Sequence, residues 1–381
     1  MRFSVDAHAI GCHLTGNEVY IRNLLHEFAR LDQGNELIAY ISKQGVETDL
    51  PGRIQTRRVS ENPYVRLGVD LPQHVRRDRP DLLHVQYTGP VFSAAPLVVS
   101  VHDVSYLECP QYFTRFRSLQ LRLTVKRTLK RAARVLTPSE FSRRAILKHY
   151  SIDEEKVVVV PNAVAGQFRP IEREVARAAI QRKFGFQRPF ILTVGDLQPR
   201  KNHLGLLQAF EDVLQAEPQL QHDLVFVGKE TWYSRELHRA VNKSALRDRV
   251  HFTGFVDDAD LVQFYGACEL FVFPSFYEGF GLPILEAMAS GRAVACSRLT
   301  AMPEVANAAG ILFDPASREE MARAMLDILL DSELRARLER LGVHRAAAFT
   351  WEKSAARTLQ VYYDVAGSRR HHDAAVAARM S

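Results

Sequence analysis

A short strand, a glycine turn and the start of a helix follow one another in the stretch Cys268-Glu269-Leu270-Phe271-Val272-Phe273-Pro274-Ser275-Phe276-Tyr277-Glu278-Gly279-Phe280-Gly281-Leu282-Pro283-Ile284-Leu285-Glu286. The apolar run at its beginning is typical of a buried strand. The glycines permit a tight turn in which the backbone approaches a ligand closely. Pro283 suits the first position of a helix, where a missing N–H costs nothing. A strand that turns directly into a helix is a unit of an α/β fold.

Two carboxylates, Glu278 in the turn and Glu286 about one turn into the helix, bracket the last part of this stretch, 278–286. A helix N-terminus has free N–H groups and a partial positive charge, which suit a phosphate. Each carboxylate can accept hydrogen bonds from a pair of hydroxyls, as on sugars. We therefore predict a nucleotide-sugar site, with the backbone N–H groups of Phe280, Gly281 and Leu282 around the phosphate.

The rest of the chain alternates short apolar runs with stretches of helical periodicity. The predicted strands are 3–5, 36–41, 82–85, 97–101 and 134–137, then 190–194, 224–227, 250–252, 270–273 and 293–296. Strands interleaved with helices in both halves predict two doubly wound parallel sheets. Ligands of such sheets bind at the carboxyl ends of strands, so we expect the two domains to face a cleft.

The predicted domain boundaries follow from length and composition. A chain of 381 residues suits two domains. The segment between Pro161 and Pro189 has charge clusters and Pro170 but no predicted strand, so it is the expected hinge. We place the domains at 1–165 and 166–350. The weakly apolar end, 369–381, is predicted to be a frayed tail.

Composition excludes several classes of protein. Hydrophobic content of 46% and charged content of 25% are ordinary for a soluble globular protein. No run approaches the ~20 apolar residues needed to span a bilayer, and residues 1–6 indicate a strand rather than a signal peptide. The scattered cysteines indicate reduced thiols rather than disulfides or a metal site; they are Cys12, Cys109, Cys268 and Cys296. We expect a cytoplasmic protein.

The segment from Glu278 to Glu286 resembles the E-x7-E motif of retaining glycosyltransferases of family 4, which have the GT-B fold of two Rossmann-like domains. Further matches follow in the family's order over about residues 1–365: Thr15-Gly16, Val101-His102-Asp103, 135–142, 160–164, Gly195-Asp196, Arg200-Lys201-Asn202, 251–256 and Phe349-Thr350-Trp351. Asp6-Ala7-His8 and His102-Asp103-Val104 are most similar to the O-antigen mannosyltransferase branch. The resemblance also implies a C-terminal helix, 351–368, that crosses back to the first domain.

A basic pair, Arg200-Lys201, follows the predicted strand 190–194 and a short loop. Arg can bind a diphosphate with bidentate hydrogen bonds and Lys as a point charge, but such a pair taken alone is more often solvated surface. The resemblance implies that both bind the leaving diphosphate, beside Gly195, where fixed cations stabilise growing negative charge. It likewise implies that Glu286 binds ribose hydroxyls and that Glu278 faces the donor sugar.

Four further positions have roles that the resemblance implies. His102 would end a strand of the first domain and reach the donor sugar, although a His-Asp pair is otherwise compatible with a satisfied core histidine. Gly16 would let the backbone pass close to the donor, although an isolated glycine is otherwise only a turn. The backbone around Phe252 and Gly254 would line the pocket for the base.

The acidic run Asp257-Asp258-Ala259-Asp260 has two interpretations. Many glycosyltransferases of another fold bind manganese through Asp-x-Asp. Here the run precedes the helical stretch 261–265, where acidic residues serve as N-cap and first-turn carboxylates. We predict a cap and no metal site. The resemblance implies metal-independent chemistry, with Arg200 and Lys201 in place of the ion and no cofactor beyond the donor substrate.

A strongly basic helix is predicted from Arg115 to Arg134, because this segment has no acidic residue and an apolar stripe. The stripe is Leu121, Val125, Leu129 and Ala132; the cations are Arg115, Arg117, Arg122, Lys126, Arg127, Lys130, Arg131 and Arg134. Such a helix is compatible with an anionic membrane surface on the inner face of the membrane, or with an ordinary packed helix that has a solvated face. Nucleic acid is disfavoured, since no reading motif accompanies the charge.

Together these features predict a retaining hexosyltransferase that uses a nucleoside-diphosphate sugar and a glycan or lipid-linked glycan acceptor bound by the first domain. The branch resemblance favours GDP-mannose as donor, with UDP-glucose as the second choice. A nucleotide-sugar epimerase or hydrolase on the same fold, and a catalytically silent membrane-associated scaffold, stay open as alternatives. The intact Glu278, Glu286, Arg200 and Lys201 speak against a silent protein.

Overall fold

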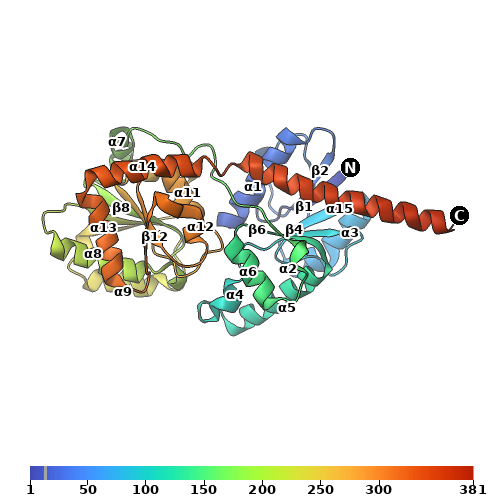
Figure 1. Ribbon diagram of the computed structural model, residues 1–381, viewed down its shortest axis with the longest axis horizontal. Helices are drawn as coiled ribbons and strands as arrows, with labels where there is room; N and C mark the ends of the chain where they lie inside the picture. The colour runs from blue at the N-terminus through green and yellow to red at the C-terminus, as the bar shows by residue number, and fades with distance from the viewer. Residues whose placement is uncertain (13–14, 381) are drawn as a thin grey trace. The chain divides into compact units, whose positions relative to one another are not determined.

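The computed structural model describes residues 1–12 and 15–380, and its chain divides into two compact units (Figure 1). Unit 1 comprises Met1–Asn162 and the segment from Thr350 onward, and unit 2 comprises Ala163–Phe349. The domain boundaries predicted from the sequence lie after residues 165 and 350. Each unit is an α/β structure with helices on both faces of a parallel sheet.

Unit 1 is built on a seven-stranded sheet of order β3-β2-β1-β4-β5-β6-β7. The order reverses between β1 and β4, as expected for a doubly wound sheet. The strands are β1 (Arg2–Asp6), β2 (Glu36–Ile41), β3 (Gln55–Arg58), β4 (Leu82–Gln86), β5 (Leu97–Ser100), β6 (Ala132–Thr137) and β7 (Val157–Val159). The main helices are α1 (Thr15–Leu31), α2 (Pro63–Val65), α3 (Leu71–Asp78), α4 (Ser105–Glu108), α5 (Arg115–Arg131) and α6 (Glu140–His149), with a π-helical turn η2 (Arg66–Asp70).

Unit 2 has a six-stranded parallel sheet of order β10-β9-β8-β11-β12-β13, which reverses between β8 and β11. Its strands are β8 (Phe190–Val194), β9 (Asp223–Val227), β10 (Val250–Gly254), β11 (Leu270–Phe273), β12 (Val294–Ser297) and β13 (Ile311–Phe313). Its helices are α7 (Arg173–Phe184), α8 (His203–Ala216), α9 (Ser234–Lys243), α10 (Asp258–Ala267), α11 (Leu282–Ala289), α12 (Met302–Ala306), α13 (Arg318–Leu330) and α14 (Ser332–Ala346). One apolar cluster joins α7, α10 and α11 to the sheet, and a second joins α8, α9 and α13 to it.

The last helix, α15 (Trp351–Met380), packs against α1 within unit 1 (Figure 1). Tyr362 of α15 is fully buried, with its ring 5.2 Å from that of Phe3 and 5.3 Å from that of Phe28. Its hydroxyl also lies 2.6 Å from Nδ1 of His84 on β4. The segment 369–381, predicted as a frayed tail, is described only as the end of this helix, and Ser381 lies outside the described residues.

The basic helix is shorter than predicted. It ends at Arg131, and Ala132 and Arg134 belong to β6, so the prediction of one helix from Arg115 to Arg134 is wrong at its C-terminal end. Its predicted apolar stripe faces the core, because Val125 and Leu129 are fully buried there. Among the described residues, no helix combines the length and apolar character needed to cross a membrane.

Candidate active site in unit 2

Glycines mark the carboxyl ends of three neighbouring strands in unit 2. Gly195 follows β8, Gly228 follows β9 and Gly254 ends β10, and all three have positive φ. The backbones approach closely: a Cβ atom on Gly228 would lie 2.1 Å from the carbonyl oxygen of Gly195, which only glycine avoids. Gly228 was not among the predicted site residues, although it directly follows the predicted strand 224–227. This edge therefore presents backbone rather than side chains, as suits a bound ligand.

A basic pair lies beside this edge. The loop after β8 forms a short 3-10 turn (Pro199–Lys201), and α8 begins two residues later at His203. Nζ of Lys201 lies 2.7 Å from Oε1 of Glu278, and Nη1 of Arg200 donates to the same oxygen at 2.9 Å. Arg200 also donates to the carbonyl of Tyr277 at 3.0 Å. The structure thus brings together three residues that the sequence predicted for one site.

The electrostatics of the trio (Arg200, Lys201 and Glu278) are unusual for a surface. Burial alone would raise the pKa of Glu278, but the charges of Arg200 and Lys201 lower it to about 2. Burial lowers the pKa of Lys201, an effect that Glu278 opposes. Lys201 is only 9% exposed, and its ammonium lies 4.8 Å from the ring centroid of Phe273. The trio itself has two positive charges and one negative charge, which suits an anion, and Asp196 is a further carboxylate whose charge acts on Lys201.

Gly195 makes room for this arrangement. A Cβ atom there would lie 3.2 Å from Cε of Lys201. The two loops that carry the trio are also tied through their backbones, because the N–H of Phe276 donates to the carbonyl of Arg200 at 2.8 Å. The turn after β11 is held by Thr300, whose hydroxyl accepts from the N–H of Glu278 at 3.2 Å.

Glu286 has a different environment from Glu278. It lies in α11, and its Oε2 accepts a hydrogen bond of 2.7 Å from the hydroxyl of Tyr265 on α10. Burial raises the pKa of Glu286 to about 7; the Tyr265 hydrogen bond opposes this shift and nearby Asp258 adds to it. The carboxylate therefore titrates near neutral pH. The sequence did not predict Tyr265, because its distance along the chain gives no signal of the contact.

The segment between the two glutamates begins α11. Leu282 is the first helical residue, so Pro283 is the second and not the first as predicted. Gly281, with φ 109, precedes the helix, and a Cβ there would lie 3.2 Å from Cδ1 of Ile284. Phe280 is buried, with its ring 5.8 Å from that of Phe349. The N-terminus of α11 thus lies directly after the turn that holds Glu278, as predicted.

The predicted base-lining residues lie on β10. The ring of Phe252 stacks on that of Phe226, with 5.1 Å between the ring centroids and 14° between the ring planes. The ring of His238, on α9, lies 4.3 Å from the ring of Phe252. Gly254 accepts a backbone hydrogen bond of 3.0 Å from Gly228. These contacts place Phe252 and Gly254 near the glycine edge, and their contact with a base stays a prediction.

The two predicted residues of unit 1 differ in their surroundings. His102 follows β5, with Nε2 3.1 Å from Oε1 of Gln86 and its ring 4.7 Å from that of Tyr20. Burial lowers its pKa to about 4, so the imidazole is neutral. Gly16 lies in the first turn of α1, not in a loop, and it is exposed. Contacts of either residue with a donor stay predictions.

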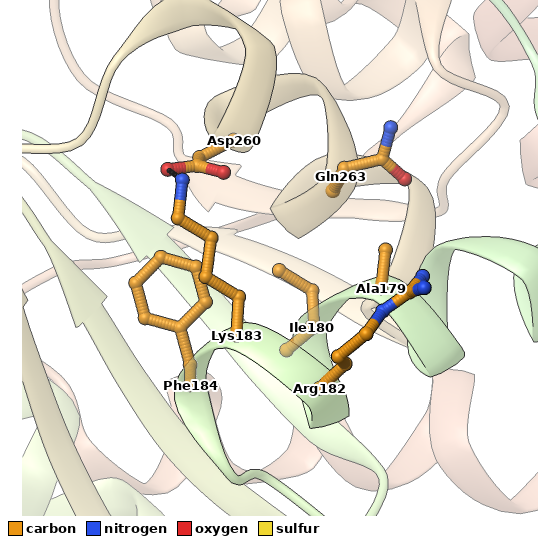
Figure 2. Close-up of a pocket in the computed structure, with 7 residues that line it drawn as sticks. All are labelled: Ala179, Ile180, Arg182, Lys183, Phe184, Asp260 and Gln263. Atoms are coloured by element: carbon orange, nitrogen blue, oxygen red, sulfur yellow. Dashed lines mark hydrogen bonds and ion pairs between the residues drawn. The ribbon is translucent and has the colours of Figure 1, made fainter.

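The acidic run forms a helix cap, as predicted. Oδ1 of Asp257 accepts from the N–H of Asp260 at 2.8 Å at the start of α10. Asp260 pairs with Lys183 beside a surface hollow between α7 and α10 (Figure 2). None of the predicted site residues lines this hollow; its lining is Ala179, Ile180, Arg182, Lys183, Phe184, Asp260 and Gln263.

Two parallel-sheet α/β units and a cationic site at a strand end are compatible with a glycosyltransferase of the GT-B fold, and comparison with known families identifies the class. Residues 14–166 match the model of Glycosyltransferase Family 4, and residues 176–344 match the model of glycosyl transferases group 1. The chain belongs to this family of hexosyltransferases, as the sequence predicted.

Among its relatives is the O-antigen chain mannosyltransferase B of Escherichia coli, 32% identical over 265 residues, which are 70% of this chain and 69% of the relative. Serotype-specific mannosyltransferase WbdA of Escherichia coli is 31% identical over 251 residues, but these cover only 31% of its length. Sucrose-phosphate synthase of Thermosynechococcus elongatus has the same fold, with a TM-score of 0.76 at 21% identity over 96% of this chain and 99% of that one. The glycosyltransferase WaaG matches with a TM-score of 0.73 at 18% identity, over 95% and 99% of the two chains.

Proposed function

We propose that this chain transfers mannose from GDP-mannose to a hydroxyl of a glycan or lipid-linked glycan, with retention of the anomeric configuration. The observation that carries the proposal is the trio of Arg200, Lys201 and Glu278 at the carboxyl edge of the unit 2 sheet, in a relative of an O-antigen mannosyltransferase. The acceptor is assigned to unit 1, and the nucleoside diphosphate of the donor to unit 2.

The basic pair supplies the main catalytic effect in this proposal. As the bond between the sugar carbon C1 and the phosphate oxygen breaks, negative charge grows on the diphosphate. Arg200 and Lys201 are held in place by Glu278, so they stabilise that charge without having to reorganise. The N–H groups of Phe280, Gly281 and Leu282 are assigned to the same phosphates, at the start of α11.

Retention requires that the new bond forms on the face that the leaving group occupied. The acceptor oxygen attacks C1 as the C1–O bond to the diphosphate breaks, and the acceptor's proton passes to the leaving phosphate oxygen. The products are a mannoside and GDP, so charge and atoms balance without an enzyme nucleophile. Glu278 and His102 are assigned to the donor sugar. Gly16 is assigned the role of letting the backbone pass close to that sugar.

The nucleoside is assigned to Glu286, Gly195, Phe252 and Gly254. The ionised Glu286 would accept hydrogen bonds from the ribose hydroxyls, and the half-buried Phe252 and the backbone at Gly254 would line the base pocket. We propose that no metal ion takes part, because Arg200 and Lys201 supply the positive charge. We also propose that the protein works in the cytoplasm at the inner face of the membrane.

A thermal-shift panel of nucleotide sugars tests the donor. A ligand that binds only the folded state stabilises it by about 2.7 kcal/mol at a hundredfold excess over Kd. We expect GDP-mannose to raise Tm more than UDP-glucose, GDP more than UDP, and Glu286→Gln to reduce the shift. A larger shift with UDP-glucose would reject mannose transfer.

Proton NMR of the products formed with an acceptor tests the reaction. An inverted linkage would reject retention. An epimer of the sugar as the sole product would indicate an epimerase, and free sugar as the sole product would indicate a hydrolase.

A further inference from the structure

The exposed apolar side chains of unit 1 gather in three segments. Among its described side chains, every large hydrophobic residue that is exposed belongs to α2 and η2, to the loop after β4, or to α5. They are Tyr64, Val65, Val69, Phe92, Phe116, Leu119 and Leu123. Phe92 and Phe116 are each 72% exposed, so two aromatic residues lie mostly in water.

Hydrogen bonds join the three segments into one surface. The N–H of Val91, next to Phe92, donates to the carbonyl of Leu67 in η2 at 2.9 Å. The carbonyl of Val91 in turn accepts from Arg127 at 2.7 Å and from Arg131 at 2.8 Å, both on α5. The loop is therefore fixed between η2 and α5. We call the surface formed by these seven apolar residues and the exposed side of α5 the α5 surface.

The exposed side of α5 combines apolar and basic residues in one stripe. Phe116, Leu119 and Leu123 are spaced by three and four residues, and Lys126 and Lys130 continue the same spacing, so all five share a helix face. The predicted stripe around Val125 is on the opposite, buried face. The other exposed cations of α5 flank it: Arg115, Arg117, Arg122, Arg127 and Arg131. No acidic residue occurs between Glu108 and Glu140.

We propose that the α5 surface docks on a lipid bilayer that contains anionic lipids. Phe92, Phe116, Leu119 and Leu123 enter the boundary between headgroups and acyl chains, where they leave water. Lys126 and Lys130 on the stripe, with Arg115 and Arg122 beside it, bind headgroup phosphates. Charge complementarity selects an anionic partner, and the protruding leucines select lipid over nucleic acid, whose phosphates give these apolar side chains no burial. The inference deepens the proposed location at a membrane and does not depend on the sugar donor.

Flotation of the full chain with vesicles tests the apolar half of the surface. The vesicles are phosphatidylcholine alone, or phosphatidylcholine mixed with phosphatidylglycerol. We expect flotation only with phosphatidylglycerol, and a loss of about tenfold or more in partition for Phe116→Ser with Leu119→Ser and Leu123→Ser. The matched control changes three exposed apolar residues of unit 2 in the same way and keeps full flotation; these are Trp232, Leu330 and Leu341.

The charged half is tested by reversing two cations on the stripe. Lys126→Glu with Lys130→Glu is expected to weaken partition by about tenfold or more, and added salt is expected to weaken the wild type similarly. The matched control is Lys243→Glu with Arg247→Glu, two exposed cations of unit 2. Unchanged unfolding temperatures and unchanged GDP-mannose shifts confirm that every variant folds and separate this inference from the proposed reaction.

Three results would overturn the inference. The apolar variant could float as well as the wild type, or the wild type could float equally on uncharged vesicles. A duplex oligonucleotide could displace the vesicles and bind the apolar variant as tightly as the wild type, which would identify a general polyanion site.

Discussion

At the residue scale, the two glutamates of the motif differ in their partners. Glu278 is held ionised by Arg200 and Lys201, whereas Glu286 faces the buried hydroxyl of Tyr265. Tyr265 is fully buried, with its ring 5.6 Å from that of Phe168, so its hydroxyl has little freedom to turn away. We expect it to orient the Glu286 carboxylate and leave the other oxygen for a ribose hydroxyl.

Replacing Tyr265 with Phe tests this orientation through pH. Burial already raises the pKa of Glu286 to about 7, so nucleotide affinity should fall as pH drops through 7 and the carboxylate is protonated. The Tyr265 hydrogen bond lowers that pKa, and Asp258 of the same helix raises it. Tyr265→Phe should therefore raise the pKa further and move the loss of GDP affinity to higher pH, as measured by calorimetry from about pH 6 to about pH 9.

Glu286→Gln serves as the control, since it cannot ionise and should give a flat, weak pH profile. The pH dependence of stability is an independent check on the raised pKa of Glu286. The Glu286 carboxyl group stays protonated up to about pH 7 in the folded chain but ionises near pH 4.5 in the unfolded chain. The free energy of unfolding of the wild type should therefore fall as pH rises between these values. An unshifted profile in Tyr265→Phe would mean that the hydroxyl does not act on Glu286.

At the scale of elements, α10 begins with a cap that resembles a metal-binding pattern in sequence. Asp257→Ala should lower the free energy of unfolding by about 1 kcal/mol, because the N–H of Asp260 loses its acceptor. Asp257→Asn keeps a capping oxygen and should lose much less, as followed by urea unfolding. Both variants should keep the wild-type GDP-mannose shift with or without excess chelator. The metal interpretation would be restored if chelator abolished the GDP-mannose shift of the wild type and if Asp257→Asn showed no such shift.

Nine of the ten strands that the sequence predicted are central in their sheets, and the tenth, β10, is an edge strand. Each of the ten predicted strands overlaps an observed one, and the nine central ones are mostly apolar, as expected for parallel strands covered on both faces. The missed strands, β3, β7 and β13, lie at sheet edges and have three or four residues. In β3 the residues are Gln55-Thr56-Arg57-Arg58, whose polar side chains lack an alternating pattern. In helix α5 the buried apolar face was predicted from the sequence. The exposed Phe116, Leu119 and Leu123 were not predicted as a second apolar group on the same helix.

At the scale of the whole molecule, the candidate site draws on loops far apart in sequence. Sequence predicted Arg200, Lys201 and Glu278 individually, through spacing and resemblance. It did not predict that both cations share one carboxylate oxygen, because Arg200 and Glu278 are 78 residues apart and only the adjacent order of β8 and β11 brings them together. Gly228 was missed for a similar reason, since its close approach to Gly195 depends on strand pairing.

The central claim is that Arg200 and Lys201 bind the diphosphate of the donor. Arg200→Ala with Lys201→Ala removes both cations and leaves the nucleoside-binding residues in place. Circular dichroism checks the fold, since Glu278 loses its buried partners. Lys243→Ala with Arg247→Ala is the matched control for lost surface charge.

Calorimetric titration of GDP-mannose into these proteins is the most direct measurement. Charge-assisted hydrogen bonds contribute about 1.5–3 kcal/mol each, so the Arg200 and Lys201 double variant should bind GDP-mannose at least about a hundredfold more weakly than the wild type. Guanosine, which lacks the diphosphate, should bind both proteins alike. Equal affinity of GDP-mannose for the folded double variant and the wild type would contradict the account.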